Sequence, residues 1–153
     1  MNSRSVSMTL NYVLVLAISS VLVTGLIIAG GSFVGDQREQ VVEGELRIIG
    51  NHLAGNMEQV DRYVGASESG DPSVAYVNQT FGDQVTGTTY QVSLGEQSGT
   101  AQVVLNATDP DVSVRVNASV GTGVDEDSFA TGGSISVAYD PSQSPPKLVI
   151  RDV

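Results

Sequence analysis

Hydrophobic residues follow three successive patterns along the chain. Residues 10–34 form a nearly uninterrupted apolar run, in which 17 of 25 residues are apolar and none is Asp, Glu, Lys or Arg. Residues 42–64 carry apolar residues at spacings of three and four, and the rest of the chain contains short segments in which apolar and polar residues alternate. These patterns predict, in order, a lipid-compatible helix, an amphipathic helix and a β-rich region.

The apolar run is long enough to cross a bilayer. A helix of 25 residues spans roughly 37 Å, and the hydrocarbon core of a membrane is about 30 Å thick. A secretory signal peptide is the alternative, but its apolar region has only about 7–15 residues and a small-residue cleavage site follows it. Here Ala29-Gly30-Gly31 continues into further apolar residues. We therefore predict a transmembrane helix over residues 6–34.

The helix is expected to continue as an amphipathic segment over residues 35–65. Its apolar residues form one stripe at helical period: Val42, Leu46, Ile49, Leu53, Met57, Val60 and Val64. The pairs Glu43–Arg47 and Glu58–Arg62 stand four residues apart in the order that favours an ion pair on a helix. Gly65 and the polar cluster after it predict the end of the helix.

The β-rich region contains six segments with strand character: residues 74–77, 88–94, 101–107, 111–119, 134–139 and 147–152. In residues 112–117, valines alternate with polar residues, as in a half-buried strand. Turn-forming residues separate the segments at hairpin spacing. We expect an α+β fold in which a long N-terminal helix packs, through its amphipathic half, on a C-terminal antiparallel β-sheet head formed by residues 66–153.

Charge is divided in the same way as hydrophobicity. The chain has 17 acidic and 7 basic residues and a net charge of −10. Arg4 is the only charged residue before residue 35, so residues 1–34 carry +1 and the remainder carries −11. An acidic surface repels phosphates, which argues against a nucleic-acid partner. The acid excess, with Lys147 as the only lysine, is typical of halophilic proteins.

Residues for catalysis and for metal binding are scarce. The chain has no cysteine, and its single histidine, His52, is predicted to be a solvated helix residue that cannot form a zinc site alone. The acidic run Asp125-Glu126-Asp127 lacks the ligand spacing of a calcium loop, so a solvated loop is the simpler interpretation. We therefore predict no enzyme, no catalytic residue, no metal and no cofactor.

Three N-x-[ST] sequons mark the β-rich region as a candidate glycoprotein domain: they begin at Asn78, Asn106 and Asn117. Every asparagine after residue 57 lies in a sequon, and none of the four before it does. Positive charges flank both ends of the apolar run in nearly equal number, so they do not decide which end of the helix faces the cytoplasm. Because glycans are added outside the cytoplasm, the sequons favour an extracellular β-rich domain on a single-pass membrane protein.

Small residues within the apolar run suggest a contact between helices. Gly25 and Ala29 stand four residues apart, and small-xxx-small patterns bring helix backbones close together in lipid. Because glycine and alanine are common in membrane helices, the pattern also fits a helix without such a contact.

The start of the chain carries a family resemblance. Arg4, the small residue Ser5 and then Val6 precede the apolar helix, and the chain resembles archaeal type IV pilin precursors. The segments DPDVSVRV and LVIRDV also resemble small haloarchaeal pilin-like membrane proteins. The resemblance implies a leader over residues 1–5 that a prepilin peptidase cuts between Ser5 and Val6. It also implies a pilin-like fold, and partners that are other pilin-like subunits bound through the hydrophobic helix.

One residue departs from the pilin pattern. Bacterial-type pilins place a glutamate at the fifth mature position, and counting from Val6 that position is Leu10. The resemblance therefore implies a structural subunit or a minor, pilin-like component of a type IV pilus-related surface filament, and polymerisation as a major subunit does not follow from it. The alternative is a permanently anchored extracellular binding or cell-adhesion domain that does not polymerise, in which Arg4 is an ordinary flanking charge.

Overall fold

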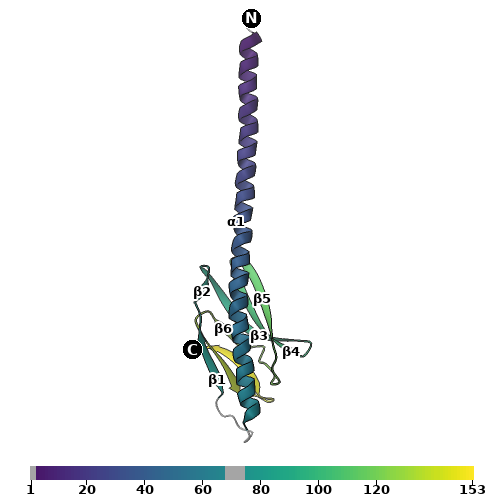
Figure 1. Cartoon of the computed structure of the whole chain (residues 1–153), viewed down its shortest axis with the longest axis vertical. Coiled ribbons are helices and arrows are strands. Elements are labelled where there is room, and N and C mark those ends of the chain that lie inside the picture. The colour runs from purple at the N-terminus through teal and green to yellow at the C-terminus, as the bar shows by residue number, and fades with distance from the viewer. Residues whose placement is uncertain (1–2, 68–74) are drawn as a thin grey trace. The chain divides into compact units, whose positions relative to one another are not determined.

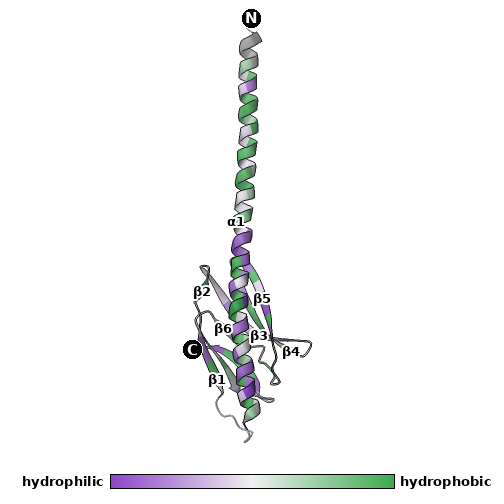
Figure 2. Cartoon of the chain, viewed as in Figure 1, coloured by the Kyte–Doolittle hydropathy of each residue, from purple (hydrophilic) through white to green (hydrophobic). Residues whose placement is uncertain are grey.

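The computed structural model describes the backbone of residues 3–67 and 75–153, and the side chains of residues 8–67 and 75–153. Helix α1 (Ser3–Ala66) has 64 residues. It contributes to two compact units, residues 1–37 and residues 38–153, each of which is described here by itself. Coloured by hydropathy, the first part of α1 is largely apolar, and polar and apolar residues are mixed in the second (Figure 2).

Eight strands follow α1 in the described chain (Figure 1). They are β1 (Tyr76–Thr80), β2 (Gln84–Val85), β3 (Thr88–Gln97), β4 (Thr100–Thr108), β5 (Asp111–Ala118), β6 (Phe129–Thr131), β7 (Ser134–Asp140) and β8 (Lys147–Asp152). A three-stranded sheet has the order β1-β7-β8, and a five-stranded sheet has the order β2-β3-β4-β5, with β6 also paired to β3. All pairings between these strands are antiparallel.

The α+β fold class is confirmed: a long N-terminal helix packs with a C-terminal antiparallel β-structure. Each of the six predicted strand segments overlaps an observed strand. The expectation of one sheet is wrong, because the strands divide into two sheets. The two strands that the sequence pattern missed, β2 and β6, have only two and three residues, too few to show an alternation.

Gly132 and Gly133 allow the chain to leave one sheet for the other between β6 and β7. A Cβ atom on Gly132 would lie 2.5 Å from the carbonyl oxygen of Asp83 and 2.8 Å from the ring of Tyr90. Gly133 has a φ of +115°, in a region that favours glycine. The close approach and the backbone angle both favour glycine at this turn, after which the chain enters the three-stranded sheet.

The core of the 38–153 unit confirms the predicted amphipathic stripe. Six stripe residues are buried and Val64 is partly buried against them. The buried six are Val42, Leu46, Ile49, Leu53, Met57 and Val60. They join buried residues of the strands in one hydrophobic cluster. At Gly50 the helix lies close to the five-stranded sheet, because an added Cβ would be 2.7 Å from Val116 Cγ2 and 2.9 Å from Leu105 Cδ1.

Of the two ion pairs predicted on the helix surface, the structure contains one. The Glu43–Arg47 ion pair is confirmed, with Nη2 and Oε1 2.5 Å apart. The Glu58–Arg62 pair is wrong, because Glu58 Oε1 accepts a hydrogen bond from the backbone N–H of Ser119 at 3.1 Å instead. A backbone donor at the end of a strand offers this carboxylate a partner that the helix sequence alone does not reveal.

Candidate functional site

The apolar segment of α1 is the most unusual surface of the 1–37 unit. Every described side chain from Met8 to Gln37 is exposed. Large apolar side chains such as Leu22, Leu26 and Ile27 are 62–73% exposed. This is the one helix in the described chain that is long and apolar enough to cross a membrane. An apolar surface of this extent is unfavourable in water and indicates burial against lipid or other helices.

Three hydroxyl groups in this segment donate hydrogen bonds to the backbone of the helix itself. Ser20 Oγ donates to the carbonyl of Leu16 at 2.9 Å, and Thr24 Oγ1 donates to the carbonyl of Ser20 at 2.8 Å. Ser32 Oγ donates to the carbonyl of Ile28 at 3.2 Å. In a lipid environment an unpaired polar group is costly, so these bonds make the segment compatible with a bilayer.

Gly25 and Ala29, the predicted packing pair, both lie on the exposed surface of this segment. A Cβ added to Gly25 would meet nothing within 4 Å, so the glycine leaves open space beside the helix. The predicted processing residues Arg4, Ser5 and Val6 have side chains outside the described residues.

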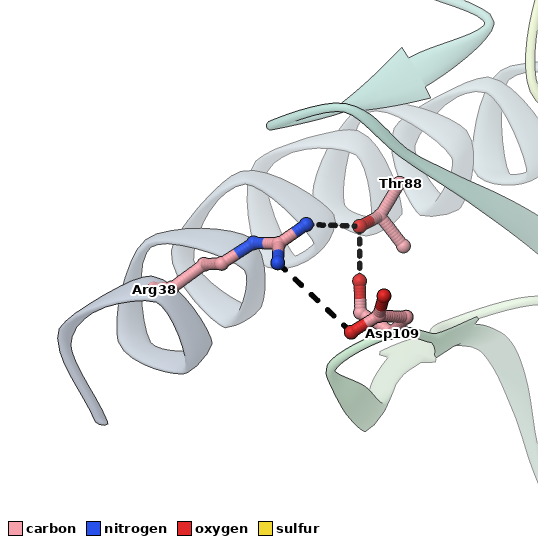
Figure 3. Close-up of polar contacts among 3 residues, drawn as sticks. All are labelled: Arg38, Thr88 and Asp109. Atoms are coloured by element: carbon pink, nitrogen blue, oxygen red, sulfur yellow. Dashed lines mark hydrogen bonds and ion pairs between the residues drawn. The ribbon is translucent and has the colours of Figure 1, made fainter. Parts of the chain in front are cut away.

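A polar cluster lies at the start of the 38–153 unit (Figure 3). Arg38 Nη2 donates to Thr88 Oγ1 at 3.3 Å, and Arg38 Nη1 lies 3.9 Å from the Asp109 carboxylate. The Thr88 hydroxyl in turn donates to the backbone carbonyl of Asp109. Thr88 is only 5% exposed. These contacts tie the helix to the first residue of β3 and to the turn between β4 and β5.

Two acidic helix residues hold the loop that follows β5. Asp61 accepts hydrogen bonds from the backbone N–H groups of Gly121 at 3.0 Å and Thr122 at 2.9 Å, while Glu58 accepts from Ser119. Partial burial raises the pKa of Asp61, but the hydrogen bonds from Gly121 and Thr122 outweigh it and the pKa is lowered. The hydrogen bonds therefore favour the ionised form of Asp61, which holds the loop after β5.

The three sequon asparagines are all exposed strand residues: Asn78 in β1, Asn106 in β4 and Asn117 in β5. Asn117 Oδ1 accepts a hydrogen bond from Gln102 Nε2 at 2.9 Å. Asn78 borders a groove of about 310 Å³ on the three-stranded sheet, and Asn106 borders one of about 490 Å³ beside Tyr90. Their exposure is compatible with glycosylation, which remains a prediction.

The residues considered for metal binding make contacts with neighbouring side chains or loops of the fold. His52 is exposed, with its ring 6.4 Å from that of Phe81. Asp125 organises its own loop, because its carboxylate accepts from Gln143 Nε2 at 2.8 Å and its backbone carbonyl accepts from Ser128 Oγ at 2.7 Å. Across residues 8–67 and 75–153, no group of three His, Asp or Glu side chains is arranged to hold a metal ion.

Residues 1–150 match a family of unknown function, DUF7266. The chain belongs to this family. No curated protein and no solved structure matches it.

In the described part of this DUF7266 chain, the candidate functional features are the exposed apolar surface of residues 8–34 and the exposed sequon asparagines. Sequence patterns located the apolar segment and the sequons, but they missed the Arg38–Thr88–Asp109 cluster and the contacts of Asp61. No local signal marks those contacts, because 50 residues separate Arg38 from Thr88 and 60 separate Asp61 from Gly121. The Tyr76-x-Asn78 spacing is visible in the sequence, and on a strand it places an aromatic ring and a sequon asparagine on the same exposed face.

Proposed function

We propose that this protein is a membrane-anchored, pilin-like structural component of an archaeal type IV pilus-related surface assembly. Residues 10–34 lie in the membrane or against neighbouring helices, and the 38–153 unit lies outside the cell. The observation that carries the proposal is the apolar surface of residues 8–34, which lacks acidic and basic residues and is exposed throughout. The same helix then supplies the core of a folded α+β unit.

The mechanism we propose is lateral packing of apolar helices. Gly25 and Ala29 leave space for another helix backbone to approach closely, so that dispersion contacts replace contacts with lipid. The second subunit is a further copy of this chain or a related pilin-like protein. A prepilin peptidase removes residues 1–5 and leaves Val6 as the first residue of the mature chain.

The orientation of the unit follows from the proposed glycans. All three sequon asparagines are on exposed strand positions, where a bulky sugar adds no clash with the core. Their location on the folded unit supports an extracellular 38–153 unit and a cytoplasmic start of the chain.

The deciding experiment is the mass of the mature N-terminus in the cells that make the protein. We expect a chain that begins at Val6, and we expect Arg4→Gln to leave residues 1–5 attached. Arg47→Gln is the matched control, because Arg47 pairs with Glu43 in the folded unit and its loss leaves processing unchanged. An intact N-terminus in the unaltered protein contradicts the pilin proposal.

Helix packing is tested separately with single cysteines, since the natural chain has none. Ala29→Cys is expected to give disulfide-linked pairs in membranes. Ile27→Cys is the control, because two residues turn a helix by about 200° and place residue 27 on the other side. Equal cross-linking at both positions contradicts a defined packing face.

A second candidate function is a permanently anchored binding or adhesion domain. It is favoured by Leu10, which stands where bacterial-type pilins carry a glutamate, and by the open grooves on both sheets. A mature chain that retains Arg4 and gives no cross-linked pairs supports this candidate instead.

A further inference from the structure

A groove of about 310 Å³ crosses the three-stranded sheet on the face opposite the core. Residues from each of its three strands, and the residue after β8, line it: Tyr76, Asn78, Ser136, Arg151, Asp152 and Val153. In the register of the sheet Asn78 lies opposite Ser136, and Ser136 lies opposite Arg151. A sequon asparagine therefore forms part of the wall of a groove.

The groove is shaped by side-chain size. Its residue from the central strand β7 is Ser136, which is small and only 4% exposed, and the next residue on that face of β7 is the equally small Ala138. Larger side chains stand on the flanking strands, with Tyr76 opposite Ala138 on one side and Arg151 opposite Ser136 on the other. A small central residue between larger neighbours leaves a furrow that offers an aromatic ring and hydrogen-bonding groups together.

Tyr76 and Asn78 are placed to act on the same ligand. They are two residues apart on β1, so their side chains project from the same face of the strand. The Tyr76 side chain is 55% exposed. The face of an aromatic ring carries partial negative charge and attracts the polarised C–H groups of a sugar. The other two sequons lack this partner, because Val104 precedes Asn106 and Arg115 precedes Asn117 at the same spacing.

We propose that this groove is the binding site of the N-linked glycan that Asn78 itself carries. The first sugar stacks on Tyr76, and hydroxyl groups of the glycan hydrogen-bond with Arg151 and Ser136. The bond forms between Asn78 Nδ2 and the anomeric carbon as that carbon leaves the phosphate of an activated sugar donor, and the Nδ2 proton is released. This inference rests on the extracellular orientation in the proposed function.

The proposed glycan has a specific consequence for Tyr76. A sugar held in the groove covers the ring, whereas a sugar that extends into solvent leaves it accessible. Tyr63 on α1 serves as the internal control. It is 59% exposed, and no sequon asparagine stands two residues after it. The two tyrosines therefore form a matched pair in one chain.

Hydroxyl-radical labelling with mass spectrometry, on full-length protein purified in detergent from the cells that make it, tests the inference. Glycosylated protein is expected to show about threefold less labelling of Tyr76 than the Asn78→Gln variant, because a stacked sugar removes most of the ring from water. Labelling of Tyr63 is expected to be equal in both. Asn117→Gln, which removes a different sequon, is expected to leave Tyr76 protected.

Two results overturn the inference. One is a glycosylated Asn78 with Tyr76 labelled as strongly as in Asn78→Gln, which means that the glycan does not occupy the groove. The other is an Asn78 that carries no sugar in the mature protein. Both are independent of the N-terminal mass measurement, so the glycan site and the pilin-like function fail separately.

Discussion

Residues 10–34 and residues 42–64 of α1 use similar apolar residues but have opposite surroundings. Leu22 is 62% exposed, whereas Leu46 is fully buried. The first segment is apolar on all sides and lacks charge, and the second confines its apolar residues to one stripe beside charged and polar ones. The arrangement of leucines and valines around the helix, rather than their number, decides whether a segment builds a protein core or meets lipid.

The largest expected effect comes from replacing a leucine by alanine in each of the two segments and comparing the losses of stability. Leu46→Ala leaves a cavity in the core and is expected to lower the free energy of unfolding of the 38–153 unit by about 2–5 kcal/mol. Leu22→Ala is the matched control and is expected to change it by less than about 0.5 kcal/mol. Denaturant unfolding in detergent micelles, followed by tyrosine fluorescence, measures both. Similar losses for the two variants would contradict the distinction.

A second comparison uses two glycines of the amphipathic segment. Gly50→Ala places a methyl group against Leu105 and Val116 and is expected to destabilise the unit by about 1–3 kcal/mol. Gly55→Ala meets open space and is expected to stabilise it by about 0.5–1 kcal/mol, because alanine favours a helix. The two variants are compared by thermal unfolding under the same conditions. Stabilisation by Gly50→Ala would show that the helix does not approach the sheet there.

Acid sensitivity tests how the amphipathic segment holds the loop after β5. The lowered pKa of Asp61 means that its ionised form stabilises the fold above the ordinary value of 3.8, and that this contribution is lost as pH falls through the lowered pKa. Asp61→Asn is expected to lower the free energy of unfolding by about 1 kcal/mol at neutral pH, which is the typical contribution of one hydrogen bond. The unfolding curves of variant and natural protein should then converge in acid. Curves that stay parallel down to pH 2 would exclude this role.

The smallest effect concerns the polar cluster at the start of the folded unit. Arg38 and Asp109 have side chains that are 44% and 88% exposed, so water screens their attraction. Arg38→Ala is expected to cost less than about 1 kcal/mol, and less still in high salt. Arg47→Ala, which removes an exposed pair within the helix, is the control and is expected to cost about 0.2–0.5 kcal/mol. A loss of several kcal/mol on replacing Arg38 would mean that the cluster is a major support of the fold.

Periodic features were predictable from the sequence, and contacts between distant segments were not. The stripe from Val42 to Val64 follows the helical period, and the exposure of Asn117 follows from the alternation along β5. The division into two sheets, and the close approach of Gly132 to Asp83 just before β7, involve distant segments and are encoded in no local pattern. The partner of Glu58 likewise depends on where the chain places the N–H of Ser119, which is 61 residues away.

The position of β8 determines the order in which this protein can acquire its structure. Leu148 and Ile150 are buried in the same core as Leu46 and Leu53, and β8 completes the sheet that contains β1 and β7. The amphipathic stripe is therefore synthesised roughly a hundred residues before its last partners, and such long-range contacts delay folding. Leu105 and Val116, which lie close to the helix at Gly50, are made earlier, so the core face of the stripe is covered in stages and the last part of its cover arrives only with β8.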